Sequence, residues 1–123
     1  MPEPPARPRA ITEKTAMSYI QVIVTTATKE EAEAIAMRLL ETRLAASVQI
    51  SPCRSLYRWR GEIREKEELR LDIKSRRELL PELTAEVRAL HSYEVPEILA
   101  LPILDAAPSY LDWLAEELKG EGR

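Results

Sequence analysis

The sequence predicts an α+β domain of ferredoxin-like topology, a split βαβ arrangement in the order β-α-β-β-α-β with one further helix at the C-terminus. Strand-like runs, which are β-branched or alternate apolar and polar residues, are followed along the chain by helix-like segments whose apolar residues recur every three or four positions. A turn signal at residues 60–61 also joins two long strand-like segments into a hairpin. These patterns predict a four-stranded antiparallel sheet, and 123 residues suffice to bury its core without disulfides or a structural metal.

The domain itself is expected over residues 18–119. Residues 1–17 contain four prolines and lack an apolar stretch of signal-peptide type, which is typical of a disordered N-terminal tail. Met17 stands directly before the first strand pattern, so translation could also begin there. Residues 120–123 form the C-terminal end.

The first strand and helix follow the tail. Tyr19–Thr25 is a β-branched run with high strand propensity. Thr28 and Glu31 have capping-box spacing and predict a helix over Lys29–Thr42. The apolar residues of that segment share one helical face, and they are Ala32, Ile35, Ala36, Leu39 and Leu40.

A long hairpin comes next. Ala46–Ile50 reads as a short strand, and Pro52 predicts a bend or bulge before the strand resumes over Ser55–Trp59. Gly61 supplies the freedom for a tight turn after Arg60. The chain is expected to return over Glu62–Lys74, where apolar and charged residues alternate in the second half.

The second half of the chain repeats the alternation of helix and strand. A helix is predicted over Glu78–Leu90, with Pro81 confined to its first turn. A fourth strand is predicted over Glu97–Ile103. Pro108 opens the last helix and Gly120 ends it, and the apolar positions in phase between them are Leu111, Leu114 and Leu118.

Both predicted helices between the strands pack on one face of the sheet, so the opposite face needs another cover. The first strand places Ile20, Val22 and Val24 on one side, but the fourth strand is apolar on both sides. The last helix or another subunit could supply the cover. The long hairpin also leaves an unpaired edge, which proteins normally protect. These features favour subunit association over a monomer.

The charge and composition exclude several classes of function. A net charge of −3 without a basic patch argues against nucleic-acid binding, and the chain has no Phe for the aromatic strand of an RNA-recognition motif. No apolar run approaches the length of about 20 residues that crosses a bilayer. The single cysteine, Cys53, favours the reducing cytoplasm. Cys53 reads as a small hydrophobe, with a thiolate metal ligand or redox role as the alternative.

Several blocks along the chain resemble one known family. His91-Ser92-Tyr93 followed by Pro96-Glu97-Ile98 is similar to the signature of the CutA divalent-cation tolerance proteins. Further matching blocks come in the same order along the chain, and they cover residues 43–46, 55–61, 100–103 and 110–114. The resemblance extends over about residues 18–118.

The resemblance implies a ferredoxin-like homotrimer linked to tolerance of divalent metals, especially copper. It also implies a cleft at subunit boundaries, similar to that of PII signalling proteins, and no established catalytic reaction. Four positions depart from the family pattern. Ser47 stands where members often carry a cysteine and Thr25 where some do, which removes soft ligands for Cu(I). Ser92 replaces a proline, and Cys53 lies where members more often have a small residue.

The candidate metal ligands surround the only histidine. His91 with Glu97, and with Glu94 as a further carboxylate, could hold a divalent cation such as Cu or Zn. Alternatively, His91 has no ligand role and simply lies at the C-terminus of the second helix, where the helix dipole favours the protonated imidazole. Glu97 could instead pair with a base or accept backbone N–H groups.

The candidate ligand cleft is aromatic. Tyr57, Trp59 and Tyr93 could stack against a small molecule, although packing of the hairpin against a neighbouring subunit also explains Tyr57 and Trp59. No nucleophile–base pair, P-loop or Gly-x-Ser-x-Gly motif indicates an enzyme. The favoured hypothesis is therefore a non-enzymatic trimer for divalent-cation tolerance. The alternatives are a PII-like module that binds a small molecule or a partner peptide and, less favoured, an enzyme acting in the same cleft.

Overall fold

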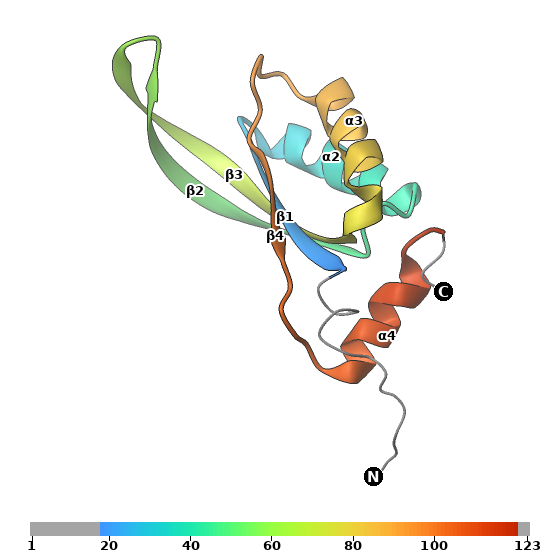
Figure 1. The fold of residues 1–123 in the computed structure, drawn as a ribbon. Helices are drawn as coiled ribbons and strands as arrows, with labels where there is room; N and C mark the ends of the chain where they lie inside the picture. Colours follow the sequence, from blue (N-terminus) through green and yellow to red (C-terminus); the bar gives the residue numbers. More distant parts are fainter. Residues whose placement is uncertain (1–17, 121–123) are drawn as a thin grey trace.

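Four strands form one antiparallel sheet in the order β2-β3-β1-β4 in the computed structural model, which describes residues 18–120 (Figure 1). The strands are β1 (Tyr19–Thr26), β2 (Ser47–Trp59), β3 (Glu62–Arg76) and β4 (Ile98–Pro102). The helices are α2 (Lys29–Glu41), a 3₁₀ turn (Arg77–Leu79), α3 (Leu80–Leu90) and α4 (Pro108–Glu117). The predicted element order is confirmed. The expected tail, including Met17, lies outside the described residues, as do residues 121–123.

Helices α2 and α3 cover one face of the sheet, and the hydrophobic core lies between them and β1 (Figure 1). Ile20, Val22 and Val24 are at most 3% exposed, as the alternation of β1 predicts. Cross-strand partners continue this face, with Val24 opposite Leu71 and Val22 opposite Ile73. The helices add the largest buried side chains, among them Ile35, Leu39, Leu83 and Val87.

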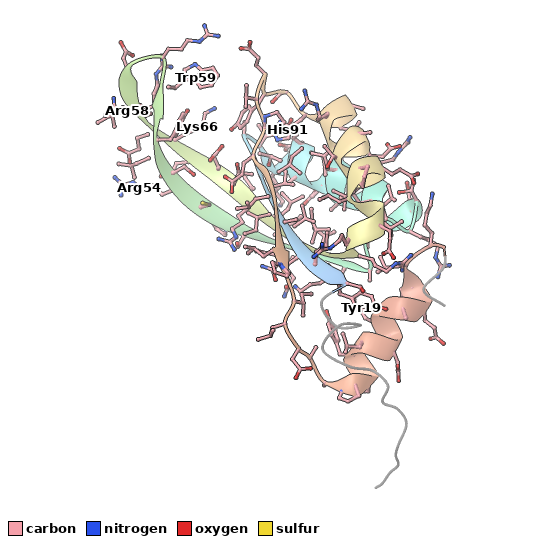
Figure 2. All side chains as sticks on the ribbon, in the orientation of Figure 1. Tyr19, Arg54, Arg58, Trp59, Lys66 and His91 are labelled. Atoms are coloured by element: carbon pink, nitrogen blue, oxygen red, sulfur yellow. The ribbon has the colours of Figure 1, made fainter. Side chains whose placement is uncertain are left out.

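The opposite face of the sheet is left open in the single chain. On β4, Leu99 and Leu101 are 46% and 43% exposed and pair with Ile23 and Gln21 of β1. Helix α4 does not cover them, because it lies beside Tyr19 at one end of the sheet (Figure 2). Of the two covers that the sequence allows, the last helix is therefore excluded for these leucines.

Two arginines hold the end of α4 against the domain. Arg43 donates from Nε to the carbonyl of Glu117 and from Nη2 to that of Glu116. Arg76, which is 4% exposed, donates from Nη2 to the carbonyl of Lys119 at 2.7 Å. Cations placed at a helix C-terminus satisfy its last carbonyls and complement the helix dipole.

The hairpin corrects one prediction. Pro52 was expected to interrupt the strand, but β2 runs unbroken from Ser47 to Trp59 and every residue keeps its partner on β3. An edge strand tolerates proline because an outward N–H is not needed for sheet pairing, and β2 is an edge strand. The predicted turn is confirmed, since Arg60 and Gly61 both have positive φ, as a two-residue type I′ turn requires.

Both helix starts follow from their local sequences. Thr28 Oγ1 accepts the backbone N–H of Glu31 at 3.1 Å, which confirms the predicted N-cap. Pro81 lies in the first turn of α3, where its missing N–H leaves no partner unsatisfied. Among the described residues, no helix is long and apolar enough to cross a membrane.

Candidate functional site

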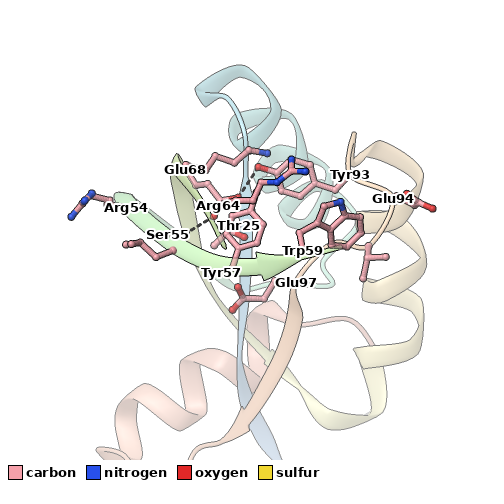
Figure 3. Close-up of a pocket in the computed structure, with 13 residues that line it drawn as sticks. Thr25, Arg54, Ser55, Tyr57, Trp59, Arg64, Glu68, Tyr93, Glu94 and Glu97 are labelled. Carbon is pink, nitrogen blue, oxygen red and sulfur yellow. Dashed lines mark hydrogen bonds between the residues drawn. The ribbon is translucent and has the colours of Figure 1, made fainter. Parts of the chain in front are cut away.

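A cavity of about 740 Å³ opens between the β2-β3 hairpin and the segment that leads into β4 (Figure 3). The three predicted cleft residues, Tyr57, Trp59 and Tyr93, all line it. Its charged lining residues are Arg54, Arg64, Lys66, Glu68, Glu94 and Glu97. The structure therefore brings two of the predicted carboxylates to the aromatic cleft, while His91 is not among its lining residues.

The cavity lies on the face of the sheet that the helices leave open. Side chains alternate along the unbroken hairpin register, so Tyr57 and Ser55 share a face with Thr25 of β1. That face also carries the exposed Leu99, which pairs with Ile23. A subunit that covered the open face would therefore lie next to the cavity.

Glu68 is the buried charge of the cavity. It is 8% exposed and accepts a hydrogen bond on each oxygen, from Ser55 Oγ at 2.6 Å and from the Tyr93 hydroxyl at 2.6 Å (Figure 3). Burial, and then the hydrogen bond to Glu68, raise the pKa of Tyr93 well above its ordinary value. The result is a carboxylate fixed in place by two hydroxyl donors.

The cations of the cavity differ in their partners. Arg54 and Arg64 form ion pairs with Glu65 and Glu62 at the exposed rim. Lys66 instead places its Nζ 4.2 Å from the centre of the Tyr93 ring, a cation–π contact. Lys66 is half-buried and carries no ion pair within residues 18–120.

His91 lies at the start of the segment that leads from α3 into β4, and its side chain is fully buried (Figure 2). Its Nδ1 accepts the backbone N–H of Tyr93 at 3.1 Å, so in the neutral ring the proton resides on Nε2, which donates to the carbonyl of Thr25 at 2.8 Å. The imidazole is also 4.8 Å from the Tyr93 ring, centre to centre. His91 thereby ties the end of β1 to the turn that carries Tyr93.

Glu31 fastens the same turn from the N-terminus of α2. Its carboxylate accepts the backbone N–H and the hydroxyl of Ser92, and it lies 3.6 Å from Nδ1 of His91. Both donors belong to Ser92, and a proline at this position would have no N–H to donate to Glu31.

The described residues do not offer a ready ligand set for a metal. Within residues 18–120, no group of three or more His, Cys, Asp or Glu side chains is placed to hold an ion. Both ring nitrogens of His91 are engaged by backbone groups, while Glu94 pairs with Arg60 at 3.2 Å. Cation binding by His91 and Glu97 stays a prediction, and the geometry of one chain does not support it.

Sequence reasoning missed the centre of the site. The alternating pattern of the strand predicts an outward Glu68, no sequence pattern distinguishes Lys66, and Glu31 stands out only through its capping spacing. The thiol of half-buried Cys53 lies 3.6 Å from Ser55 Oγ and thus beside the Glu68 network. The regular register of the hairpin, which places Cys53 opposite Glu68, is the signal that could have found this cluster.

Comparison with known proteins finds relatives that match most of the length of this chain. Residues 20–117 match the family model of the CutA1 divalent ion tolerance protein. The chain is 49% identical over 96 residues to the divalent-cation tolerance protein CutA of Thermus thermophilus, covering 77% of this chain and 93% of that protein.

Solved structures agree with this match. The Cut A1 structure from Thermus thermophilus has a TM-score of 0.80 at 46% identity, covering 82% of this chain and 99% of that one. The CutA structure from Archaeoglobus fulgidus, whose description calls that protein periplasmic, has a TM-score of 0.80 at 40% identity with coverages of 82% and 99%. The chain therefore belongs to the CutA1 divalent ion tolerance family.

Proposed function

We propose that this protein acts in divalent-cation tolerance as a non-enzymatic, ferredoxin-like homotrimer in the cytoplasm. The observation that carries the assembly is the open sheet face, where Leu99 and Leu101 remain exposed on the edge strand β4. The hairpin adds two further exposed apolar side chains, Leu56 at 60% and Ile63 at 72%. Apolar side chains beside unpaired strand edges favour association, because exposed apolar surface is unfavourable in water and a free edge can pair with a strand of another chain. The number of three subunits comes from the family resemblance.

The cavity supports a second, PII-like function, in which a small ligand or a partner peptide binds at the open face. Its volume of about 740 Å³ falls within the range of small-molecule sites, and its aromatic walls surround one fixed carboxylate. Because the cavity opens on the face that lacks a cover, a neighbouring subunit would complete its wall. A ligand there would couple binding to the assembly.

Binding of Cu or Zn at His91 and Glu97 is a separate proposal. It requires His91 to release a backbone partner, since both ring nitrogens are hydrogen-bonded. Calorimetric titration of the full chain with Cu(II) and Zn(II) tests it. Heat that disappears in His91→Ala supports the site, and heat that is unchanged in this variant overturns it.

A complementation assay tests the proposed function as a whole. A bacterial strain that lacks its own member of this family would be grown with inhibitory Cu(II) or Zn(II) while it expresses this chain. We expect the wild type to restore growth and a Leu99→Asp/Leu101→Asp variant to fail, with Leu104→Asp as the matched control on the loop after β4. Equal growth with and without the wild-type chain would contradict the proposal.

A further inference from the structure

We propose that the cavity binds a small zwitterion, namely a free α-amino acid with an apolar side chain. The inference rests on the proposed use of the cavity as a ligand site and specifies the ligand. It is carried by the presence of both charge signs among the unpaired groups of the lining, by the position of Lys66 beside Glu68, and by the aromatic walls.

The lining favours a ligand that carries both signs of charge. Arg54, Arg64 and Glu94 already pair with Glu65, Glu62 and Arg60 at the exposed rim, so the lining charges without an ion pair within residues 18–120 are Lys66, Glu68 and Glu97. A simple anion would be attracted to Lys66 and repelled by the carboxylates, and a simple cation would be repelled by Lys66. A dipolar molecule can satisfy both kinds of charge at once.

Lys66 and Glu68 are placed to bind the two charged groups of such a molecule. They stand two residues apart on β3, so their side chains share a face at a backbone spacing of about 7 Å. Each Glu68 oxygen accepts one hydroxyl and retains one further acceptor position for an ammonium group. The Lys66 ammonium, held over the Tyr93 ring without an ion pair in the described chain, can donate to a carboxylate.

The aromatic walls would hold the apolar side chain. Tyr57 and Trp59 project from the same face of β2, opposite Arg64 and Glu62 of β3. Trp59 is half-buried and carries the Arg60 guanidinium 5.1 Å from its ring centre. Aromatic walls with a few fixed polar groups are the usual composition of a small-molecule site, in which the polar groups set orientation.

Calorimetry and thermal shift on the full chain test the inference with three probes that share one ring. L-phenylalanine carries both charges, phenethylamine only the ammonium, and 3-phenylpropionate only the carboxylate. We expect L-phenylalanine to bind and to raise the melting temperature, as a ligand of the folded state does. Each single-charge analogue should bind at least about tenfold more weakly, because either Lys66 or Glu68 then loses its ion pair with the ligand.

Two variants and one control locate the binding. Lys66→Met and Glu68→Gln should each weaken L-phenylalanine binding at least about tenfold, while Glu67→Gln should not, because Glu67 lies on the opposite face of β3. Equal affinity for all three probes, no binding of any, or an equal loss in the control would overturn the inference. If no probe binds but the wild type still restores growth in the complementation assay, the proposed function stands and only this ligand assignment fails.

Discussion

The Tyr93 hydroxyl donates a 2.6 Å hydrogen bond to Oε2 of Glu68, 25 residues away in the sequence. This bond joins the turn after α3 to the middle of the long hairpin, and both residues line the cavity. The same turn is fixed from behind by His91, which bonds the carbonyl of Thr25, and by Glu31, which bonds Ser92. The position of Tyr93 is therefore determined from three separate elements.

Replacement of Tyr93 by Phe should destabilise the protein. The change removes one of the two donors of the buried Glu68 carboxylate, and hydrogen bonds to charged groups contribute about 1.5–3 kcal/mol. We expect the free energy of unfolding, measured by urea denaturation, to fall by about 2 kcal/mol. Tyr110→Phe on the exposed side of α4 is the matched control and should have little effect. Equal losses in the two variants would show that the bond to Glu68 contributes nothing specific.

Stability should decrease at alkaline pH. Burial raises the pKa of both Tyr93 and Tyr19 above the ordinary value of 10.0. These two tyrosines therefore lose their protons at a lower pH in the unfolded chain than in the folded protein. Their contribution to the free energy of unfolding is complete below pH 10 and is lost as pH rises through the folded-state pKa values. Urea midpoints measured between pH 8 and pH 11 should fall only at the upper end. The fall should be smaller in Tyr93→Phe, and an unchanged slope in that variant would contradict its role.

The imidazole of His91 should carry its proton on Nε2 when neutral. Nδ1 accepts the Tyr93 N–H and Nε2 faces the carbonyl of Thr25, so the opposite tautomer would lose both bonds. Long-range ¹H–¹⁵N NMR reads the tautomer directly, and no assignment is needed because His91 is the only histidine. A neutral ring protonated on Nδ1 would contradict the described hydrogen bonds.

Charges placed on the open face should break the assembly but not the fold. Leu99→Asp/Leu101→Asp puts two carboxylates where we expect an apolar contact between subunits. Light scattering should report a lower mass for this variant, while far-UV circular dichroism stays unchanged because neither side chain belongs to the core. Leu104→Asp, at a position 68% exposed beyond β4, should leave the mass unaltered. A variant that keeps the wild-type mass would place the subunit contact elsewhere.

The element order could be predicted from the sequence because hydrophobic periodicity differs so clearly between the strands and the helices. Pro52 was misjudged, since a local rule about proline in strands does not reveal which strand will lie at the edge of the sheet. The last helix could not be placed either. The apolar residues Leu111, Leu114 and Leu118 of this segment are buried, as their spacing predicts, but the position of the helix beside Tyr19 also involves hydrogen bonds from Arg43 and Arg76 to carbonyl groups more than 40 residues away.

The candidate site was predictable only in part. The aromatic residues were found because large side chains near a hairpin turn are conspicuous. The role of His91 could not be derived, because both of its hydrogen-bond partners are backbone groups, which sequence patterns do not report. Glu68 was hidden for a related reason: a carboxylate in an alternating strand reads as exposed until two hydroxyls from other segments are brought to it.

The mass of the full chain in solution tests the central claim, namely that sister copies cover the open face of the sheet. Multi-angle light scattering at micromolar concentration should give three times the chain mass of 14.0 kDa. A particle of 14.0 kDa under those conditions would mean that Leu99, Leu101 and the hairpin edge face water. The cavity would then be bounded by one chain alone, and the proposed trimer would be wrong.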